Sequence, residues 1–315
     1  MKINYKSNIC FIVAALIWGL AFVAQDLASV KLEHFTINGL RCLIAFIFIM
    51  PVIIIKSKKE KTKIFEETKE KRYLTIIGGI ICGICLVFAM NLQQLGISLY
   101  GEDAASSSRT GFITGLYVIL VPVVSVIFLK KKLNINIIIS VLLALIGLYL
   151  LCFGSGFEKI NIADFVNLIC ALCFAIQILF VDKYVKVVDG IKLSSIQLLT
   201  CGIISLLLSL IFEKPNINNI IDVILPILFL GIFSSGIAYT LQIVGQKYSN
   251  NPTVDSILMS LESVFAVLGG AILLEEVLEI KEIIGCIIMF IAIILSQIPI
   301  KQKTKINNIQ EENNV

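Results

Sequence analysis

The stretch FAMNLQQLG, residues 88–96, returns 149 positions later as IAYTLQIVG, residues 237–245. Ala, Leu, Gln and Gly occupy the same four places in both copies. A second alignment, at a shift of 156, brings two apolar segments near the N-terminus onto two segments of the second half, with Trp18 opposite Phe174 and Arg41 opposite Gln197. The chain is therefore predicted to contain one structural unit twice.

The composition predicts that this unit lies in a membrane. Of the 315 residues, 58% are hydrophobic and 15% are charged, whereas soluble domains have roughly 45–50% apolar and 25% charged residues. A helix that crosses a bilayer needs about 20 mostly apolar residues. Windows of that length predict ten transmembrane helices, near residues 8–30, 34–55, 73–95, 104–129, 133–153, 160–182, 194–212, 220–246, 253–274 and 280–299.

The predicted fold class is an all-α integral membrane protein in which two five-helix repeats, residues 8–153 and 160–299, are followed by a polar tail at 300–315. Because five is odd, the second repeat enters the membrane from the opposite side, so the repeats have inverted topology. Loop charges agree: residues 130–132 are three lysines, whereas the corresponding loop at 275–279 carries three glutamates. Inverted repeats characterise secondary transporters, which alternate access around a site near the membrane midplane.

The distribution of positive charge predicts the orientation. With the N-terminus in the cytoplasm, twenty of the 26 Lys and Arg residues fall in cytoplasmic loops and tails and only four outside. Positive charge in short loops marks the cytoplasmic side, so both termini are predicted to be cytoplasmic, including the tail at 300–315. The basic stretch at 56–72 is expected to face the anionic leaflet rather than nucleic acid.

Several segments give the chain a family resemblance over residues 8–299. Their landmarks are ALIWGLAF (15–22), Arg41, SSRTGFITGLYVILVP (107–122), IAYTLQIVGQKY (237–248) and SLESVFAVLGGAILLEE (260–276). In this order and in a duplicated frame, the chain resembles the drug/metabolite transporter superfamily, and EamA-type permeases in particular. The resemblance implies export of small organic solutes, often amino acids or other metabolites, across the bacterial plasma membrane.

The chain departs from the pattern of this family at two points. Family members commonly have Glu-Pro where this chain has Glu262-Ser263, so no proline predicts a kink in the ninth helix, whereas Pro122 keeps the equivalent place in the fourth. The connection ISLYGEDAASSS, between the third and fourth helices, is also a few residues longer than usual. This extra length predicts an altered outer mouth.

Arg41 is the strongest candidate for a substrate-binding residue. An arginine at membrane depth costs about 3 kcal/mol on insertion scales and is rare unless it faces a cavity or a partner. Its repeat partner Gln197 favours a central site, since polar side chains on both sides of the pseudo-symmetry axis would line one cavity. Snorkelling toward the outer headgroups and a structural ion pair are the alternatives.

Other polar and aromatic residues at membrane depth complete the predicted substrate-binding set. Glu262 falls near the middle of the ninth helix, where it would suit proton coupling or an amine substrate; a structural role is the alternative. Trp18 and Tyr239 have amphipathic rings that suit a cavity for an organic solute or a membrane interface. Asn91 either lines the path or bonds neighbouring helices, and bridging is favoured for Gln93 and Gln242, which the repeats share.

The sequence contains none of the motifs that would favour other classes of activity. It has no GxxxxGK[ST] phosphate cradle, no HExxH and no GxSxG, and its CxxC pairs at 82–85 and 170–173 lie in apolar helices, where packing is expected. No enzyme activity, cofactor or metal is predicted. The expected partners are a small-molecule substrate and the lipid bilayer. A driving proton or counter-solute, a homodimer and a non-transporting sensor or scaffold remain open, and an intramembrane enzyme is a weaker alternative.

Overall fold

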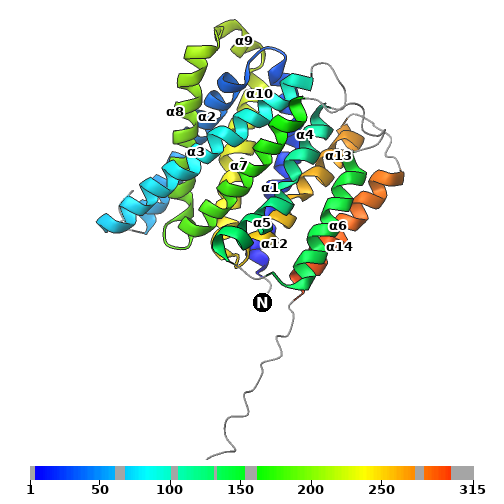
Figure 1. The fold of residues 1–315 in the computed structure, drawn as a ribbon. Helices are drawn as coiled ribbons and strands as arrows, with labels where there is room; N and C mark the ends of the chain where they lie inside the picture. The colour runs from blue at the N-terminus through cyan, green and yellow to red at the C-terminus, as the bar shows by residue number, and fades with distance from the viewer. Residues whose placement is uncertain are drawn as a thin grey trace, which may run out of the picture.

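The computed structural model describes residues 4–60, 68–100, 106–130, 133–152, 162–273 and 280–298, and these residues are helical apart from their short connections (Figure 1). The predicted tail at 300–315 lies outside them. The helices of the first half are α1 (Tyr5–Ser29), α2 (His34–Lys59), α3 (Lys69–Tyr100), α4 (Ser106–Gly115), α5 (Tyr117–Leu129) and α6 (Ile135–Cys152). Those of the second half are α7 (Ile162–Val185), α8 (Gly190–Phe212), α9 (Ile217–Asp222), α10 (Ile224–Phe229), η1 (Leu230–Ala238), α11 (Tyr239–Tyr248), α12 (Pro252–Met259), α13 (Leu261–Leu273) and α14 (Ile280–Gln297).

Eight helical segments within the described residues are long and apolar enough to cross a membrane. A further apolar helix, Ile135–Leu150, is shorter. The predicted ninth helix is divided into α12 and α13 at Ser260, and the predicted eighth contains η1, a π-helical segment. The predicted fourth is likewise divided into α4 and α5 at Leu116.

The surface of this bundle is apolar, and many polar side chains are buried. Phe128, Ile211 and Leu225 each expose at least 70% of their surface. By contrast, Asn38, Gln94 and many serines on the same kinds of helix are fully buried. Soluble proteins show the reverse preference, so the outer surface is suited to lipid and the protein is a multi-pass membrane protein.

The two halves of the chain interleave. α2 packs along α8, and α3 packs along both α7 and α8, while α6 and α14 pair at the other side of the bundle (Figure 1). Small residues permit the α3–α8 contact: a Cβ at Gly79 would lie 2.5 Å from Ile196 Cγ2, and one at Gly83 would lie 2.6 Å from Thr200 Cβ. The main helix–helix contacts of each half are therefore made with helices of the other half.

Polar contacts tie α2 to α8 at both ends of the pair. At one end, Asp189 caps α8 by accepting from the backbone N–H groups of Ile191 and Lys192, and its Oδ2 atom lies 2.5 Å from Lys56 Nζ at the end of α2. At the other end, the Glu213 carboxylate accepts from the backbone N–H groups of Phe35 and Thr36, both at 2.7 Å. Each carboxylate satisfies N–H groups that a helix start leaves unpaired.

Candidate functional site

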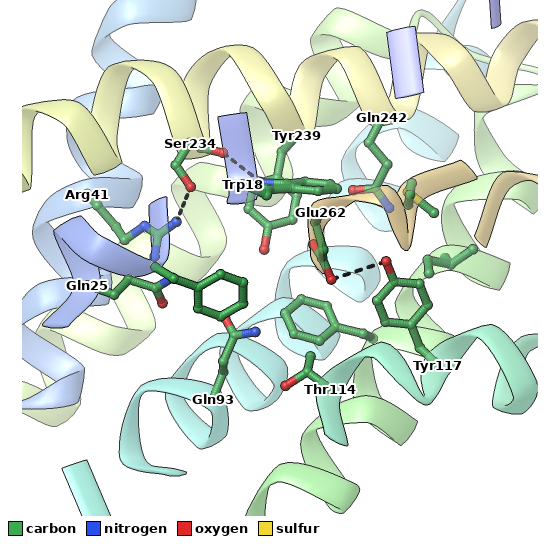
Figure 2. Close-up of a pocket in the computed structure, with 14 residues that line it drawn as sticks. Trp18, Gln25, Arg41, Gln93, Thr114, Tyr117, Ser234, Tyr239, Gln242 and Glu262 are labelled. Atoms are coloured by element: carbon green, nitrogen blue, oxygen red, sulfur yellow. Dashed lines mark hydrogen bonds between the residues drawn. The ribbon is translucent and has the colours of Figure 1, made fainter. Parts of the chain in front are cut away.

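One cavity lies between the two halves of the chain (Figure 2). α1, α2, α3, α4 and α5 contribute to its wall from the first half, and α7, η1, α11, α12 and α13 from the second. Its lining residues are Trp18, Phe22, Gln25, Arg41, Gln93, Thr114, Tyr117, Phe174, Ile178, Ser234, Tyr239, Gln242, Met259 and Glu262. A mostly apolar cavity with a few convergent polar groups is the usual form of a small-molecule site.

Arg41 lines this cavity. Within the described part of the chain, the side-chain partners of its guanidinium are neutral hydroxyl groups. Its side chain is 3% exposed. Nε donates to Ser235 Oγ at 2.8 Å and Nη2 donates to Ser234 Oγ at 2.7 Å. No described carboxylate lies within ion-pair distance of Arg41. A buried cation held by hydroxyls alone retains the capacity to bind an anionic group.

The two hydroxyls that hold Arg41 come from the π-helical segment η1. π-Helical turns are rare and occur frequently at functional sites. The wider turn leaves the Ser234 carbonyl to accept a hydrogen bond from Trp18 Nε1, at 3.1 Å. These serines were not among the predicted site residues, because serines in an apolar helix are equally expected at helix–helix contacts.

Glu262 lines the same cavity, apart from Arg41. It occupies the first turn of α13, where the helix dipole favours a carboxylate, and it is 7% exposed. Tyr117 Oη donates to Glu262 Oε1 at 3.3 Å. The helix break that precedes Glu262 forms without a proline at position 263, and Ser260, at the break, donates through Oγ to the Ile257 carbonyl at 2.8 Å. The missing proline therefore does not remove the interruption.

Aromatic rings occupy the space between these two charged residues in the view of Figure 2. The rings of Trp18 and Tyr239 meet edge to face, with centroids 5.1 Å apart and planes at 62°. Next to Trp18, Gly19 lets α1 approach α13 closely, because a Cβ there would lie 2.7 Å from the Glu262 carbonyl oxygen. The crossing of α1 and α13 thus places Trp18 next to the backbone of Glu262.

The structure brings four of the six predicted site residues to the cavity, namely Trp18, Arg41, Tyr239 and Glu262. The other two are not among its lining residues. Asn91 Nδ2 donates to Ser205 Oγ at 2.9 Å and its Oδ1 accepts from Asn38 at 3.0 Å, so it joins α3 to α8 and α2. Gln197 Oε1 accepts from Gln177 Nε2 at 3.0 Å.

Other polar residues of the lining were assigned differently or missed. Gln93 and Gln242, for which a bridging role was favoured, both line the cavity, as do Gln25 and Thr114. Within the described residues, His, Cys, Asp and Glu form no group of three or more that could hold a metal ion. The cavity offers hydrogen bonds, one basic and one acidic side chain, and aromatic surface.

Comparison with known proteins places the chain among transporters. An uncharacterized transporter of Archaeoglobus fulgidus is 28% identical over 281 residues, which cover 89% of this chain and 82% of that protein. The uncharacterized transporter YoaV of Bacillus subtilis is 24% identical over 300 residues, with 92% and 96% of the two chains covered. Both are similar to this chain over nearly its whole length.

A solved crystal structure of a protein shares the fold, with a TM-score of 0.73 at 15% identity over 93% of this chain and 97% of the other. The model of the EamA-like transporter family matches the chain twice, at residues 6–153 and 161–297. The two matches account for nearly every helix that surrounds the cavity, and the relatives are transporters. The protein is therefore a membrane transporter that belongs to the EamA-like transporter family.

Proposed function

We propose that this protein is a secondary transporter that moves a small organic metabolite by alternating access, with the central cavity as its substrate site. The observation that carries the proposal is Arg41: a buried cation in a cavity shared by both halves, with hydroxyl partners in place of a carboxylate. Keeping a charge buried in this way is costly. Binding of a substrate with the opposite charge, in a cavity that also admits water, would explain why an arginine is present at this depth.

The ten-helix inverted-repeat architecture is part of this proposal. The repeats would comprise residues 8–153 and 160–299. Eight spans meet the criteria of length and composition; the ninth and tenth would be the apolar helix Ile135–Leu150 and the divided pair α12 and α13. Interrupted helices at the cavity support this reading, because transporters build midplane sites from discontinuous helices.

The orientation follows from charge. We place both termini, and the tail at 300–315, in the cytoplasm and the protein in the plasma membrane, because this arrangement puts twenty Lys and Arg residues inside against four outside. The ion pair of Lys56 and Asp189 would then lie on the cytoplasmic side, and Glu213 with the start of α2 on the outer side. Reporter fusions at each terminus test this assignment.

The charges of the cavity support an amphoteric substrate, such as an amino acid or a related compound. Arg41 would bind its anionic group, and Glu262 with Tyr117 would face its cationic group. Trp18 and Tyr239 would contact its apolar part. The family resemblance favours export.

Energy for transport would come from a proton or a counter-solute. Glu262 is the candidate for the coupling group, since it is a buried carboxylate in the cavity. If protons couple through it, Glu262→Gln keeps the acceptor for Tyr117 and abolishes the response of uptake to an imposed pH gradient.

Uptake into proteoliposomes tests the proposed function. Purified protein would be reconstituted and offered a pooled, labelled mixture of amino acids and other metabolites, with and without a pH gradient and with vesicles preloaded with the unlabelled pool. Accumulation above that of protein-free vesicles is expected. Absence of accumulation under every gradient would overturn the proposal and favour the sensor or scaffold alternative.

A further inference from the structure

Three glutamine side chains form a hydrogen-bonded chain beside the cavity. Gln242 Nε2, on α11, donates to Gln177 Oε1, on α7, at 3.2 Å. Gln177 Nε2 in turn donates to Gln197 Oε1, on α8, at 3.0 Å. All three side chains are buried, with Gln177 and Gln197 fully so and Gln242 only 2% exposed. This row of three glutamines therefore links the interior of the second half to the cavity wall.

One end of this chain faces the cavity with an acceptor that has no partner in the described structure. Gln242 lines the cavity, and its Oε1 atom is buried without a hydrogen bond. Figure 2 shows its side chain reaching from α11 toward the cavity. A buried polar atom left unpaired is destabilising, and a ligand in the cavity that donates a hydrogen bond would satisfy it.

The hydrogen bond to Gln177 determines which atom of Gln242 is left for a ligand. Gln242 Nε2 is engaged by Gln177 Oε1, so Oε1 is the atom without a partner; at the far end of the row, Gln197 Nε2 is likewise buried without a partner in the described structure. Among the polar groups that line the cavity, Arg41 supplies donors, and Gln242 Oε1 and the Glu262 side chain supply acceptors. A primary ammonium group carries three N–H donors, which is enough for a hydrogen bond to each acceptor.

We propose that Gln242 Oε1 accepts a hydrogen bond from a primary ammonium group of the substrate, beside Glu262, and that Gln177 and Gln197 position its amide for this contact. The inference rests on the proposed function, since it takes the cavity as the substrate site. It gives Gln197 the role of a positioning residue that acts through Gln177 and lies three hydrogen bonds from the ligand.

Trp18 makes the test direct. It is the only tryptophan of the chain and it lines the cavity, so its fluorescence reports occupancy of the site. The probes would be L-leucine and L-phenylalanine, each beside its des-amino acid, 4-methylpentanoate or 3-phenylpropionate. Each pair shares its carboxylate and apolar part and differs in the ammonium group. Titrations would use the purified full chain in nanodiscs.

The variant Gln242→Met removes the acceptor at nearly constant volume. It is expected to weaken binding of the amino acids about tenfold, the effect of one charged hydrogen bond, and to change binding of the des-amino acids less than about twofold. Unchanged binding of the des-amino probes also verifies that the variant is folded. The control is Gln246→Met: Gln246 is buried one turn further along α11, donates to the Ile178 carbonyl and is not among the lining residues.

The positioning role is tested at Gln177. Gln177→Leu removes the acceptor for Gln242 Nε2 and is expected to reduce the preference for amino acid over des-amino acid, whereas Gln197→Glu keeps the acceptor for Gln177 Nε2 and should preserve the preference. Equal losses for both probe types in Gln242→Met, or no loss for either, would overturn the inference while leaving the cavity as the binding site. A wild-type protein that binds no probe would contradict the amphoteric-substrate proposal, and the inference with it.

Discussion

Arg41 Nη2 donates to Ser234 Oγ at 2.7 Å, joining a helix of the first half to the π-helical segment of the second. Arg41 Nε and Ser235 Oγ form a parallel bond at 2.8 Å. A guanidinium has a planar, forked set of donors, and two consecutive serines on a widened turn match two of them. The remaining donors are the ones that an anionic substrate group would use.

Removal of both hydroxyls tests this arrangement. In the double variant Ser234→Ala and Ser235→Ala, the guanidinium is no longer held in one orientation, while the Ser234 carbonyl that accepts from Trp18 is retained. Charged hydrogen bonds contribute about 1.5–3 kcal/mol each, so we expect the KM for uptake to rise about tenfold or more.

The control for the serine pair is Ser296→Ala. Ser296 is also buried, but its hydroxyl donates to the Ile293 carbonyl within α14, and it is not among the lining residues. Its KM should match that of the wild type. Equal KM values for the double variant and the wild type would show that the serines do not orient Arg41 for binding.

Gly19→Ala tests the crossing of α1 and α13. The added methyl group would lie 2.7 Å from the Glu262 carbonyl oxygen and 2.8 Å from the Ala266 backbone nitrogen. Backbone at this distance must move, and overpacking of this kind costs about 1–3 kcal/mol. We expect a lower Tm in nanodiscs and loss of most uptake.

A second glycine near the cavity provides the matched control. A Cβ at Gly111, on α4, would lie 3.6 Å from the nearest ring atom of Phe22, which is an ordinary contact. Gly111→Ala should therefore leave Tm and uptake nearly unchanged. Wild-type behaviour of Gly19→Ala would mean that the close crossing is not needed for the site.

The ion pair of Lys56 and Asp189 predicts a pH dependence of stability. Burial alone would raise the pKa of the Asp189 carboxyl, but the hydrogen bond from Lys56 and the backbone N–H of Lys192 outweigh this effect and hold the pKa below its ordinary value. A carboxyl with a depressed pKa stabilises the folded state at pH values above its unfolded pKa, about 3.9, and this stability is lost as the pH falls through the folded pKa.

The comparison with Asp189→Asn isolates this charge. Asparagine caps a helix about as well as aspartate, so the variant loses the ion pair and keeps the cap. The difference in Tm between wild type and variant should be constant from about pH 8 to pH 5 and shrink below about pH 4. A difference that grows on acidification contradicts the assignment.

The sequence predicted more of the fold than of the site. The repeat and the apolar windows indicated where the helices lie, because each span must be apolar over its length. The interruption at Ser260 and the π-helical segment around Ser234 were not predicted, since both depend on contacts with α1 and α2. Similarly, Gln197 was paired with Arg41 by the repeat, but its own partner, Gln177, determines where its amide lies.

Residues that are individually unusual were easier to identify as cavity residues. A single arginine and a single glutamate in apolar helices are conspicuous because membrane depth makes them costly. Serine and glutamine carry no such signal, since both commonly bond neighbouring helices in membranes. This is why Ser234 was missed and why Gln242 was assigned a bridging role.

Uptake by Arg41→Gln tests the central claim. This claim is that an arginine is tolerated at membrane depth because it faces substrate and water in the cavity, not lipid. The variant would be compared in proteoliposomes with wild type and with Arg72→Gln, the same substitution at an exposed position of α3. We predict that Arg41→Gln loses at least about 90% of uptake, as expected for the loss of about 1.4 kcal/mol or more of binding, while Arg72→Gln retains it. Normal uptake by Arg41→Gln would contradict the claim and assign Arg41 a structural role.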